Sequence, residues 1–347
     1  MQNDVALELL LPELNSIDQA TLWLADENAL SAISSVNPHP LLTIVTNRYD
    51  IYQLAKKNKH TTVFTDFNTE DYSQHSFTKI VYRVSKEKAL VNFLLNQACQ
   101  LLASNGELII SGYKQDGIKS YSSQINKVLK ASGKLKKKGI CYLGKFSNLT
   151  KNRLLGDQDY PQLQKIIPLQ NNKYGYSKPG VFGWNKIDQG TSLLLAAFDK
   201  YYHQLKPTPK TMLDIGCGYG WIALNMDQYK LESITATDNN AAALISANKN
   251  ATLTTTNTII KASDCGNTIN EKFDLVLCNP PFHQGFKHDQ KLIEKFLASG
   301  HKHLKKGAHG FFVVNEFIPI ESISNKKFEK TEVLTKENGF KVVLLKK

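Results

Sequence analysis

The stretch Thr211-Met212-Leu213-Asp214-Ile215-Gly216-Cys217-Gly218-Tyr219-Gly220 decides the fold of the chain. Its apolar first half predicts a buried strand, its glycines predict a turn, and residues 221–226 predict a helix. The spacing is Gly-x-Gly-x-Gly, whereas a dinucleotide site needs Gly-x-Gly-x-x-Gly, and no lysine follows as in a phosphate-binding loop. The stretch therefore indicates an open α/β sheet that binds a nucleotide lacking a pyrophosphate.

Acidic residues follow two further predicted strands. Residues 233–237 lead to Asp238, which is placed to accept hydrogen bonds from both hydroxyls of a ribose. Residues 258–261 lead to Asp264, whose side chain could accept from an adenine amino group. An Asp at a strand end is also often the N-cap of the next helix, and Asp238 can serve both purposes.

A fourth strand-like run, residues 273–277, leads into Cys278-Asn279-Pro280-Pro281-Phe282-His283. The prolines fix the backbone and remove two donors, so the Asn279 side chain and the Pro280 carbonyl can direct acceptors at one amino group. Phe282 is a ring that can stack on a base. Asn-Pro and Pro-Pro are also ordinary turn signals, so the functional interpretation depends on the features upstream.

The order of glycine turn, ribose acid, adenine acid and Asn-Pro-Pro-Phe describes a site for S-adenosylmethionine beside a planar amino group. The candidate catalytic residues are Asn279, Pro280 and Phe282. The candidate cofactor-binding residues are Asp214, Gly216, Gly218, Gly220, Asp238, Asp264 and Asn279. The cysteines are scattered, with no Cys-x-x-Cys pair and no histidine at zinc spacing, so we expect neither a metal site nor a disulfide framework.

The first half of the chain repeats the pattern of the second. Residues 77–83 align with 273–279. Residues 90–110 repeat the pattern of 291–312, and both are predicted as helix, glycine turn and strand. We therefore predict two tandem Rossmann-like domains, each an open, mostly parallel, doubly wound sheet with an antiparallel closing strand.

The chemistry is missing from the first copy. Residues 21–29 contain no glycine, and Tyr82-Arg83-Val84-Ser85-Lys86 replaces Asn-Pro-Pro-Phe. We predict a degenerate methyltransferase-like domain over residues 1–150, a linker over 151–172 and the catalytic domain over 173–347.

Charge favours a polyanionic partner. The 347 residues include 43 Lys and Arg against 31 Asp and Glu, which gives a net charge of +12. A cluster of lysines in the first domain is the candidate contact for such a polyanion, although lysine runs are also typical of solvated helix ends. The cluster comprises Lys127, Lys130, Lys134, Lys136, Lys137 and Lys138.

The N-terminus has no basic segment followed by an apolar run, and no stretch reaches the ~18 apolar residues of a membrane helix. We therefore expect a soluble, cytoplasmic protein without a membrane partner, and we expect a monomer.

From about Lys178 onward the chain resembles the ribosomal RNA guanine-N2 methyltransferases of the RsmC and RlmG type. The stretches that carry the resemblance are Pro179-Gly180-Val181-Phe182, Ile187-Asp188-Gln189-Gly190-Thr191-Ser192-Leu193-Leu194-Leu195, Leu213 to Gly218, and Asn279 to His283. Gly183-Trp184 departs from the small polar and basic pair expected after Phe182, which puts any RNA contact of that basic side chain in doubt.

The resemblance implies methyl transfer to the exocyclic N2 of a guanine in 16S rRNA, with 23S rRNA as the alternative. Direct in-line transfer would proceed with the amino group held by Asn279 and Pro280. The substrate-binding candidates are Phe182, Phe282, His283, Lys136, Lys137 and Lys138.

Two other classes of function stay open. One is an amino methyltransferase acting on adenine N6 or on a protein glutamine, in which Tyr is more common where this chain has Phe282. The other is a non-catalytic RNA-binding ribosome assembly factor that retains the fold.

Overall fold

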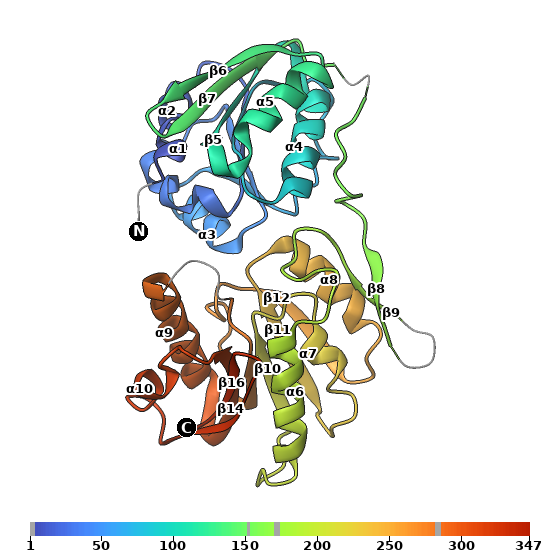
Figure 1. The fold of residues 1–347 in the computed structure, drawn as a ribbon, viewed down its shortest axis with the longest axis vertical. Helices are drawn as coiled ribbons and strands as arrows, with labels where there is room; N and C mark the ends of the chain where they lie inside the picture. Colours follow the sequence, from blue (N-terminus) through green and yellow to red (C-terminus); the bar gives the residue numbers. More distant parts are fainter. Residues whose placement is uncertain (1–3, 151–152, 170–173, 282–285) are drawn as a thin grey trace. The chain divides into compact units, whose positions relative to one another are not determined.

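The computed structural model describes residues 4–150, 153–169, 174–281 and 286–347. The chain divides into two compact units, Met1–Gln162 and Leu163–Lys347 (Figure 1). The boundary between the two units lies within the predicted linker, residues 151–172.

The first unit contains a sheet of seven strands among its described residues, in the order β3-β2-β1-β4-β5-β7-β6. Strands β1 to β5 run parallel, whereas β7 is antiparallel to both β5 and β6. The strands are β1 (Thr21–Ala25), β2 (Leu42–Thr46), β3 (Thr61–Phe64), β4 (Phe77–Arg83), β5 (Leu102–Tyr113), β6 (Ser132–Lys138) and β7 (Cys141–Ser147). The helices are α1 (Val5–Glu8), α2 (Leu11–Asn15), η1 (Glu27–Ser31), η2 (Ile33–Ser35), α3 (Tyr49–Lys57), α4 (Lys88–Leu101), η3 (Lys114–Asp116) and α5 (Ile118–Lys127).

The second unit repeats this order as β12-β11-β10-β13-β14-β16-β15 and adds a two-stranded ribbon of β8 and β9 within the described part of the chain. Its strands are β8 (Gln164–Pro168), β9 (Tyr174–Ser177), β10 (Thr211–Ile215), β11 (Ser233–Asp238), β12 (Asn257–Ala262), β13 (Phe273–Cys278), β14 (Leu304–Asn315), β15 (Lys330–Glu337) and β16 (Phe340–Lys346). Its helices are α6 (Gln189–Tyr202), α7 (Trp221–Leu224), α8 (Ala241–Ala251), α9 (Phe286–His303) and α10 (Ile320–Ser324).

The two sheets share an irregularity as well as a strand order. Pairing of β4 with β5 shifts between Phe77 and Lys79, and pairing of β13 with β14 shifts between Phe273 and Leu275. These residues are the ones that the sequence comparison aligns. The prediction of two tandem doubly wound domains is confirmed.

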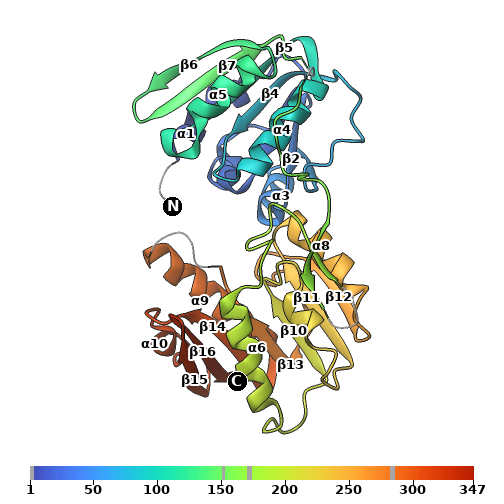
Figure 2. The same cartoon turned by 45° about the vertical axis from the view of Figure 1, so that its right-hand side comes forward.

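Helices cover both faces of the second sheet (Figure 2). On β13 the side chains alternate: Val276 packs with α9 and α10, whereas Leu275 and Leu277 pack with α6 and α7. Such a strand is buried on both faces and reads as a continuous apolar run. Each fully buried Leu, Ile or Phe contributes about 1.5–3 kcal/mol relative to exposure, so the carboxyl ends of β10 and β13 are held on a rigid core.

Two local predictions need correction. No glycine turn separates α4 from β5 or α9 from β14, because the strands begin at Leu102 and Leu304 directly after the helices. Residues 103–106 and 305–308 lie within the irregular pairing of these strands. The start of the predicted linker is attached to the first unit, where Leu155 and Tyr160 are buried in its core and the Tyr160 hydroxyl donates to Asp66 Oδ1 at 2.8 Å.

Candidate active site

The glycine turn follows β10 and is folded as a tight loop. Gly216, Gly218 and Gly220 have φ angles of +79°, +55° and +83°. Residues other than glycine rarely adopt such positive φ angles. The amides of Gly216 and Cys217 donate to the Thr237 carbonyl of β11 at 2.8 and 2.9 Å. The turn is therefore fastened to the neighbouring strand.

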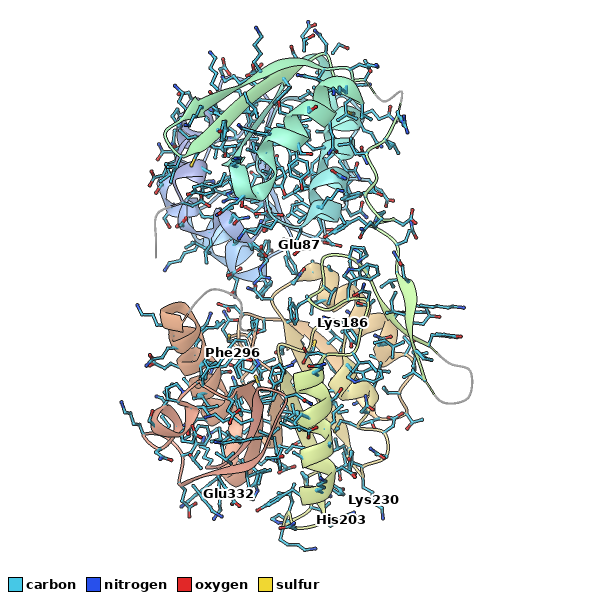
Figure 3. The ribbon with its side chains drawn as sticks, in the orientation of Figure 1. Glu87, Lys186, His203, Lys230, Phe296 and Glu332 are labelled. Carbon is cyan, nitrogen blue, oxygen red and sulfur yellow. The ribbon has the colours of Figure 1, made fainter. Side chains whose placement is uncertain are left out.

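The turn leaves room for a ligand at its centre. A Cβ added to Gly218 would meet no atom of the chain within 4 Å. At Gly216 the Cβ would lie 3.4 Å from Phe296 of α9, a side chain labelled in Figure 3. Open space beside a glycine backbone is what close approach of a nucleoside requires.

Asp214 is a fully buried carboxyl on β10. Neither of its oxygens has a hydrogen-bond partner within the described ranges. Burial, followed by the nearby charge of Asp238, raises the pKa of Asp214 to about 8. A buried acid without a partner is costly, and it fits a site that is completed by a cationic ligand.

Asp238 closes the turn from the end of β11. Its Oδ2 accepts from the Gly218 amide at 2.9 Å, and its Oδ1 accepts from the Asn240 amide at 2.8 Å. The N-cap of α8 is Asn240, so Asp238 is not the cap of that helix. Its carboxylate lies next to the open space at Gly218, as the prediction of a ribose acid requires.

Asp264 follows β12 and forms an ion pair. Both carboxylate oxygens lie 2.5 Å from Lys295 Nζ of α9. The preceding Ser263 amide donates to the Asp238 carbonyl at 2.9 Å, which sets the two acidic segments side by side. The salt bridge gives Asp264 a structural role in addition to the adenine contact that we predict.

Asn279 follows β13 at the same edge of the sheet. Its Nδ2 donates to Asp188 Oδ2 and to Thr191 Oγ1, both at 2.8 Å. Asp188 is the N-cap of α6 and also accepts from the Thr191 amide at 2.8 Å. Because Nδ2 faces these two acceptors, Oδ1 lies on the other branch of the amide, and no described residue donates a hydrogen bond to it.

The rest of the Asn-Pro-Pro-Phe segment is described only in part. Pro280 is buried and Pro281 is exposed. Phe282 and His283, predicted to contact the substrate, lie outside the described residues.

Phe182 lies in the loop between β9 and α6, and 61% of its surface is exposed. The loop is attached to the cofactor side of the unit, since the Gly180 carbonyl accepts from Asn240 Nδ2 at 2.8 Å. The carbonyl of Lys186, labelled in Figure 3, accepts from the Tyr219 hydroxyl at 3.3 Å. An exposed ring on a loop anchored to the glycine turn is compatible with a contact to a base.

Of the lysines predicted to contact RNA, Lys127 is the last residue of α5, whereas most of the others lie in a strand. Lys136, Lys137 and Lys138 belong to β6, the outer strand of the first sheet, and all three are exposed. Lysines on an outer strand also discourage pairing with other strands, so the solvated interpretation and the RNA contact both remain compatible with the structure.

The first unit has a network of charged side chains at the place where the second unit has the Asn279 side-chain amide. Arg83 occupies the position of Asn279 and is buried. Its guanidinium contacts Asp4 at 3.0 Å and Asp116 at 2.8 Å. Since a guanidinium offers donors and no acceptor, this copy cannot hold an amino group in the same way.

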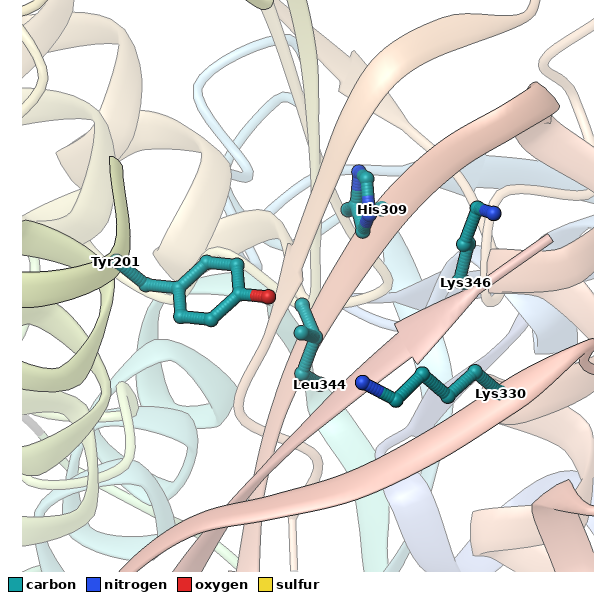
Figure 4. A pocket seen from close by; sticks show the side chains of 5 residues that line it. All are labelled: Tyr201, His309, Lys330, Leu344 and Lys346. Atoms are coloured by element: carbon teal, nitrogen blue, oxygen red, sulfur yellow. The ribbon is translucent and has the colours of Figure 1, made fainter. Parts of the chain in front are cut away.

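A pocket at the other end of the second sheet is a separate feature (Figure 4). Its lining residues are Tyr201, His309, Lys330, Leu344 and Lys346. His309 lies before Phe312, the residue of β14 that pairs with Cys278, and so the pocket lies toward the amino ends of the parallel strands. The candidate site is at their carboxyl ends.

Other site chemistries find no support in the described ranges. They contain no group of three or more His, Cys, Asp or Glu side chains that could hold a metal ion. Burial raises the pKa of the Cys278 thiol well above its ordinary value, which is the opposite of what a nucleophile needs. In the same ranges, no helix is long and apolar enough to cross a bilayer.

Sequence reasoning identified Asn279 but not the residues that orient it. In the sequence, Asp188 and Thr191 stand out only as part of a stretch that resembles the family. An acid three residues before a threonine at a helix start is a cap signal, and the contact with Asn279 depends on the fold.

Both units of the chain are similar to known proteins. Residues 175–344 match the family model Methyltransferase small domain, and residues 8–153 match Methyltransferase small domain N-terminal. The chain is 31% identical over 275 residues to the ribosomal RNA small subunit methyltransferase C of Hamiltonella defensa. The aligned region covers 79% of this chain and 78% of the relative. It is 28% identical to that of Colwellia psychrerythraea over 92% and 90% of the two chains.

A solved structure shares the whole fold. The T. thermophilus 16S rRNA N2 methyltransferase (RsmC), in complex with AdoMet and guanosine, superposes with a TM-score of 0.83, at 19% identity, over 100% of this chain and 92% of that one. The two units share one strand order, and a family model matches each of them. The chain belongs to the ribosomal RNA small subunit methyltransferase C family.

Proposed function

We propose that the second unit transfers a methyl group from S-adenosylmethionine to the exocyclic N2 of a guanine in 16S rRNA. The observation that carries the proposal is the fixed amide of Asn279, whose Nδ2 is held by Asp188 and Thr191 so that Oδ1 is available as an acceptor. The family and the names of its members support the choice of 16S rRNA. They favour it over 23S rRNA, adenine N6, a protein glutamine and a non-catalytic role.

The cofactor is S-adenosylmethionine, and the residues present fit it. The open space at Gly218 would allow the nucleoside to approach the backbone. Asp238, bonded to the Gly218 amide, would accept from the ribose hydroxyls, and the unpartnered Asp214 suits a cationic group. When bound, S-adenosylmethionine supplies a methyl group on a positively charged sulfonium. We assign the adenine amino group to Asp264.

Holding the amino group is the main task of the chain in this reaction. The N2 amino group is a poor nucleophile because its lone pair is delocalised into the base. If Asn279 Oδ1 and the Pro280 carbonyl accept its two hydrogens, the nitrogen becomes more tetrahedral and its lone pair is directed away from both acceptors. Orientation of this kind can lower a barrier by about 7–11 kcal/mol.

No strong base is required by this scheme. The nitrogen becomes acidic only once it carries the additional methyl group, so its proton can leave afterwards to water or to His283. Phe282 would stack on one face of the base and Phe182 on the other. The transfer is proposed to be direct and in line, without a covalent intermediate on the chain.

We propose that the first unit contributes RNA binding. It carries the exposed lysines 136–138, and it lacks the glycines and the amide that the chemistry needs. A guanine within a helix must be unstacked at a cost of a few kcal/mol, which contacts to the surrounding phosphates could offset.

The proposal is tested by incubating the full chain with S-adenosylmethionine and ribosomal RNA from a strain lacking the gene. We expect N2-methylguanosine in 16S rRNA, detected by mass spectrometry of nucleosides. Methylation of 23S rRNA, of adenine or of protein, or no methylation with bound cofactor, would replace the proposal by the corresponding alternative.

A further inference from the structure

We infer that Asp188 is a positioning residue that fixes the amide orientation of Asn279, and thereby makes the site accept a hydrogen-bond donor such as an amino group. The inference rests on the proposed function of the second unit. Asp188 does not need to touch the substrate for this role, because it acts through Asn279.

The contacts form a closed chain of hydrogen bonds. Asp188 Oδ2 accepts from Asn279 Nδ2 at 2.8 Å, from the Thr191 amide at 2.8 Å and from Thr191 Oγ1 at 3.2 Å. Thr191 Oγ1 in turn accepts from Asn279 Nδ2 at 2.8 Å. Thr191 is buried, so water competes little for these bonds.

The donors and acceptors in this set of hydrogen bonds are compatible with only one arrangement of the hydrogens. An ionised carboxylate only accepts, so the Thr191 hydroxyl must use its single hydrogen on Asp188. The hydroxyl oxygen is then an acceptor for Asn279, and both hydrogens of the Asn279 amide are used by Asp188 and Thr191. A flipped amide would turn Oδ1 toward the carboxylate, where two acceptors repel each other.

The orientation decides what the site can recognise. With Oδ1 presented, Asn279 pairs with groups that donate hydrogens, such as an exocyclic amine. A flipped amide would present Nδ2 instead, which pairs with carbonyl oxygens and opposes an amine. Asp188 therefore contributes to the choice of acceptor group as well as to the rate.

The first unit contains the same kind of contact, with an arginine in place of the asparagine. Asp4 is the N-cap of α1; it accepts from the Leu7 amide at 3.1 Å and from Arg83 Nε at 3.0 Å. Helix α1 packs on β5 and β7 as α6 packs on β14 and β16. In both copies a capping acid thus reaches the end of the central strand, and only the copy with an asparagine there is left with an acceptor.

Because Asp188 also caps α6, the test must separate capping from orientation. Asp188→Ser retains a cap but has a shorter side chain and no charge to hold Asn279. Thr191→Val keeps the shape and the capped amide while removing the hydroxyl, and Thr191→Ser returns the hydroxyl. Asp4→Ser makes the same exchange in the copy without the glycine turn and serves as the matched control.

The measurements are kcat at saturating S-adenosylmethionine, the cofactor dissociation constant by calorimetry and the midpoint of thermal unfolding. We expect Asp188→Ser to lower kcat by roughly 10- to 100-fold, the effect of one lost charge-assisted hydrogen bond, with the other two quantities near those of the unchanged chain. Thr191→Val should lower kcat about tenfold, with Thr191→Ser recovering most of the loss. Asp4→Ser should leave kcat within a few-fold.

The outcomes distinguish this inference from the proposed function. If Asn279→Ala is inactive while Asp188→Ser and Thr191→Val keep full kcat, the positioning role is wrong and the proposed function stands. If Asn279→Ala itself keeps full kcat, the amino-holding mechanism fails, and the positioning role fails with it. A loss of kcat that is matched by a fall in the unfolding midpoint of Asp188→Ser, but absent from Thr191→Val, would reduce Asp188 to a helix cap.

Discussion

Cofactor binding should depend on pH through Asp214. The pKa of about 8 arises from burial, with a smaller contribution from the charge of Asp238, and neither carboxylate oxygen has a partner among the described residues. At this pKa roughly 10% of the carboxyl is ionised at pH 7 and roughly 1% at pH 6. A cationic ligand that requires the ionised form should therefore bind roughly 50-fold more tightly at pH 8 than at pH 6.

Calorimetry measures both the affinity and the proton. The dissociation constant of S-adenosylmethionine should fall from pH 6 to pH 8, and close to one proton should be released at pH 7, seen as a dependence of the enthalpy on the buffer. Asp214→Asn is the control, since the pH dependence that remains in this variant belongs to the cofactor and to other groups. Equal pH dependence in both proteins would refute the role of Asp214.

The same carboxyl has a predictable effect on stability. Its pKa in the folded chain lies above the ordinary value of 3.8, so the folded state is stabilised by the proton and loses that stability as pH rises toward 8. Asp214→Asn should therefore raise the unfolding midpoint at pH 8 more than at pH 5, while weakening cofactor binding. A lower midpoint at pH 8 would contradict the burial of an unpaired acid.

Three further predictions concern the turn, the ribose acid and the lysines. Gly218→Ala should weaken cofactor binding at least tenfold, because the added methyl group would fill the open space beside this residue, whose φ is +55°. Gly339→Ala is the control for backbone strain, since Gly339 has a φ of +78° and its Cβ would also meet no atom within 4 Å. Equal losses of affinity in the two variants would exclude a cofactor beside Gly218. Asp238→Ala should raise the dissociation constant of the cofactor by a similar factor, and an unchanged constant would remove it from the ribose site. Replacing Lys136, Lys137 and Lys138 by Glu should weaken RNA binding and lower its salt dependence by up to about 0.9 per lost phosphate contact, measured by filter binding; the exposed Lys326 and Lys327 provide the control pair, and an effect no larger than theirs would leave the β6 lysines as solvated residues.

The strand ends were predictable from sequence because the signals there are local. Gly216, Asp238 and Asn279 each follow a strand-like run, and the carboxyl ends of parallel strands meet at one edge. The internal comparison of residues 77–83 with 273–279 was sufficient to predict the first sheet from the second, and the irregular pairing that the two sheets share supports it.

The remaining features depend on contacts between distant segments. Asp188 and Asn279 are joined only by the fold, so the orientation of the amide could not be read from either stretch. The raised pKa of Asp214 follows from its burial in the folded structure. The lysines 136–138 resemble a helix end in composition, yet pairing with β7 makes them part of an outer strand.

The central claim is that Asn279 holds a guanine N2 amino group of 16S rRNA for methylation. It is tested most directly by nucleoside mass spectrometry of 16S rRNA from a deletion strain complemented with the natural gene or with Asn279→Ala. The account predicts that one N2-methylguanosine is lost on deletion, returns with the natural gene and stays absent with Asn279→Ala, although the variant still binds S-adenosylmethionine. Full restoration of N2-methylguanosine by Asn279→Ala would contradict it.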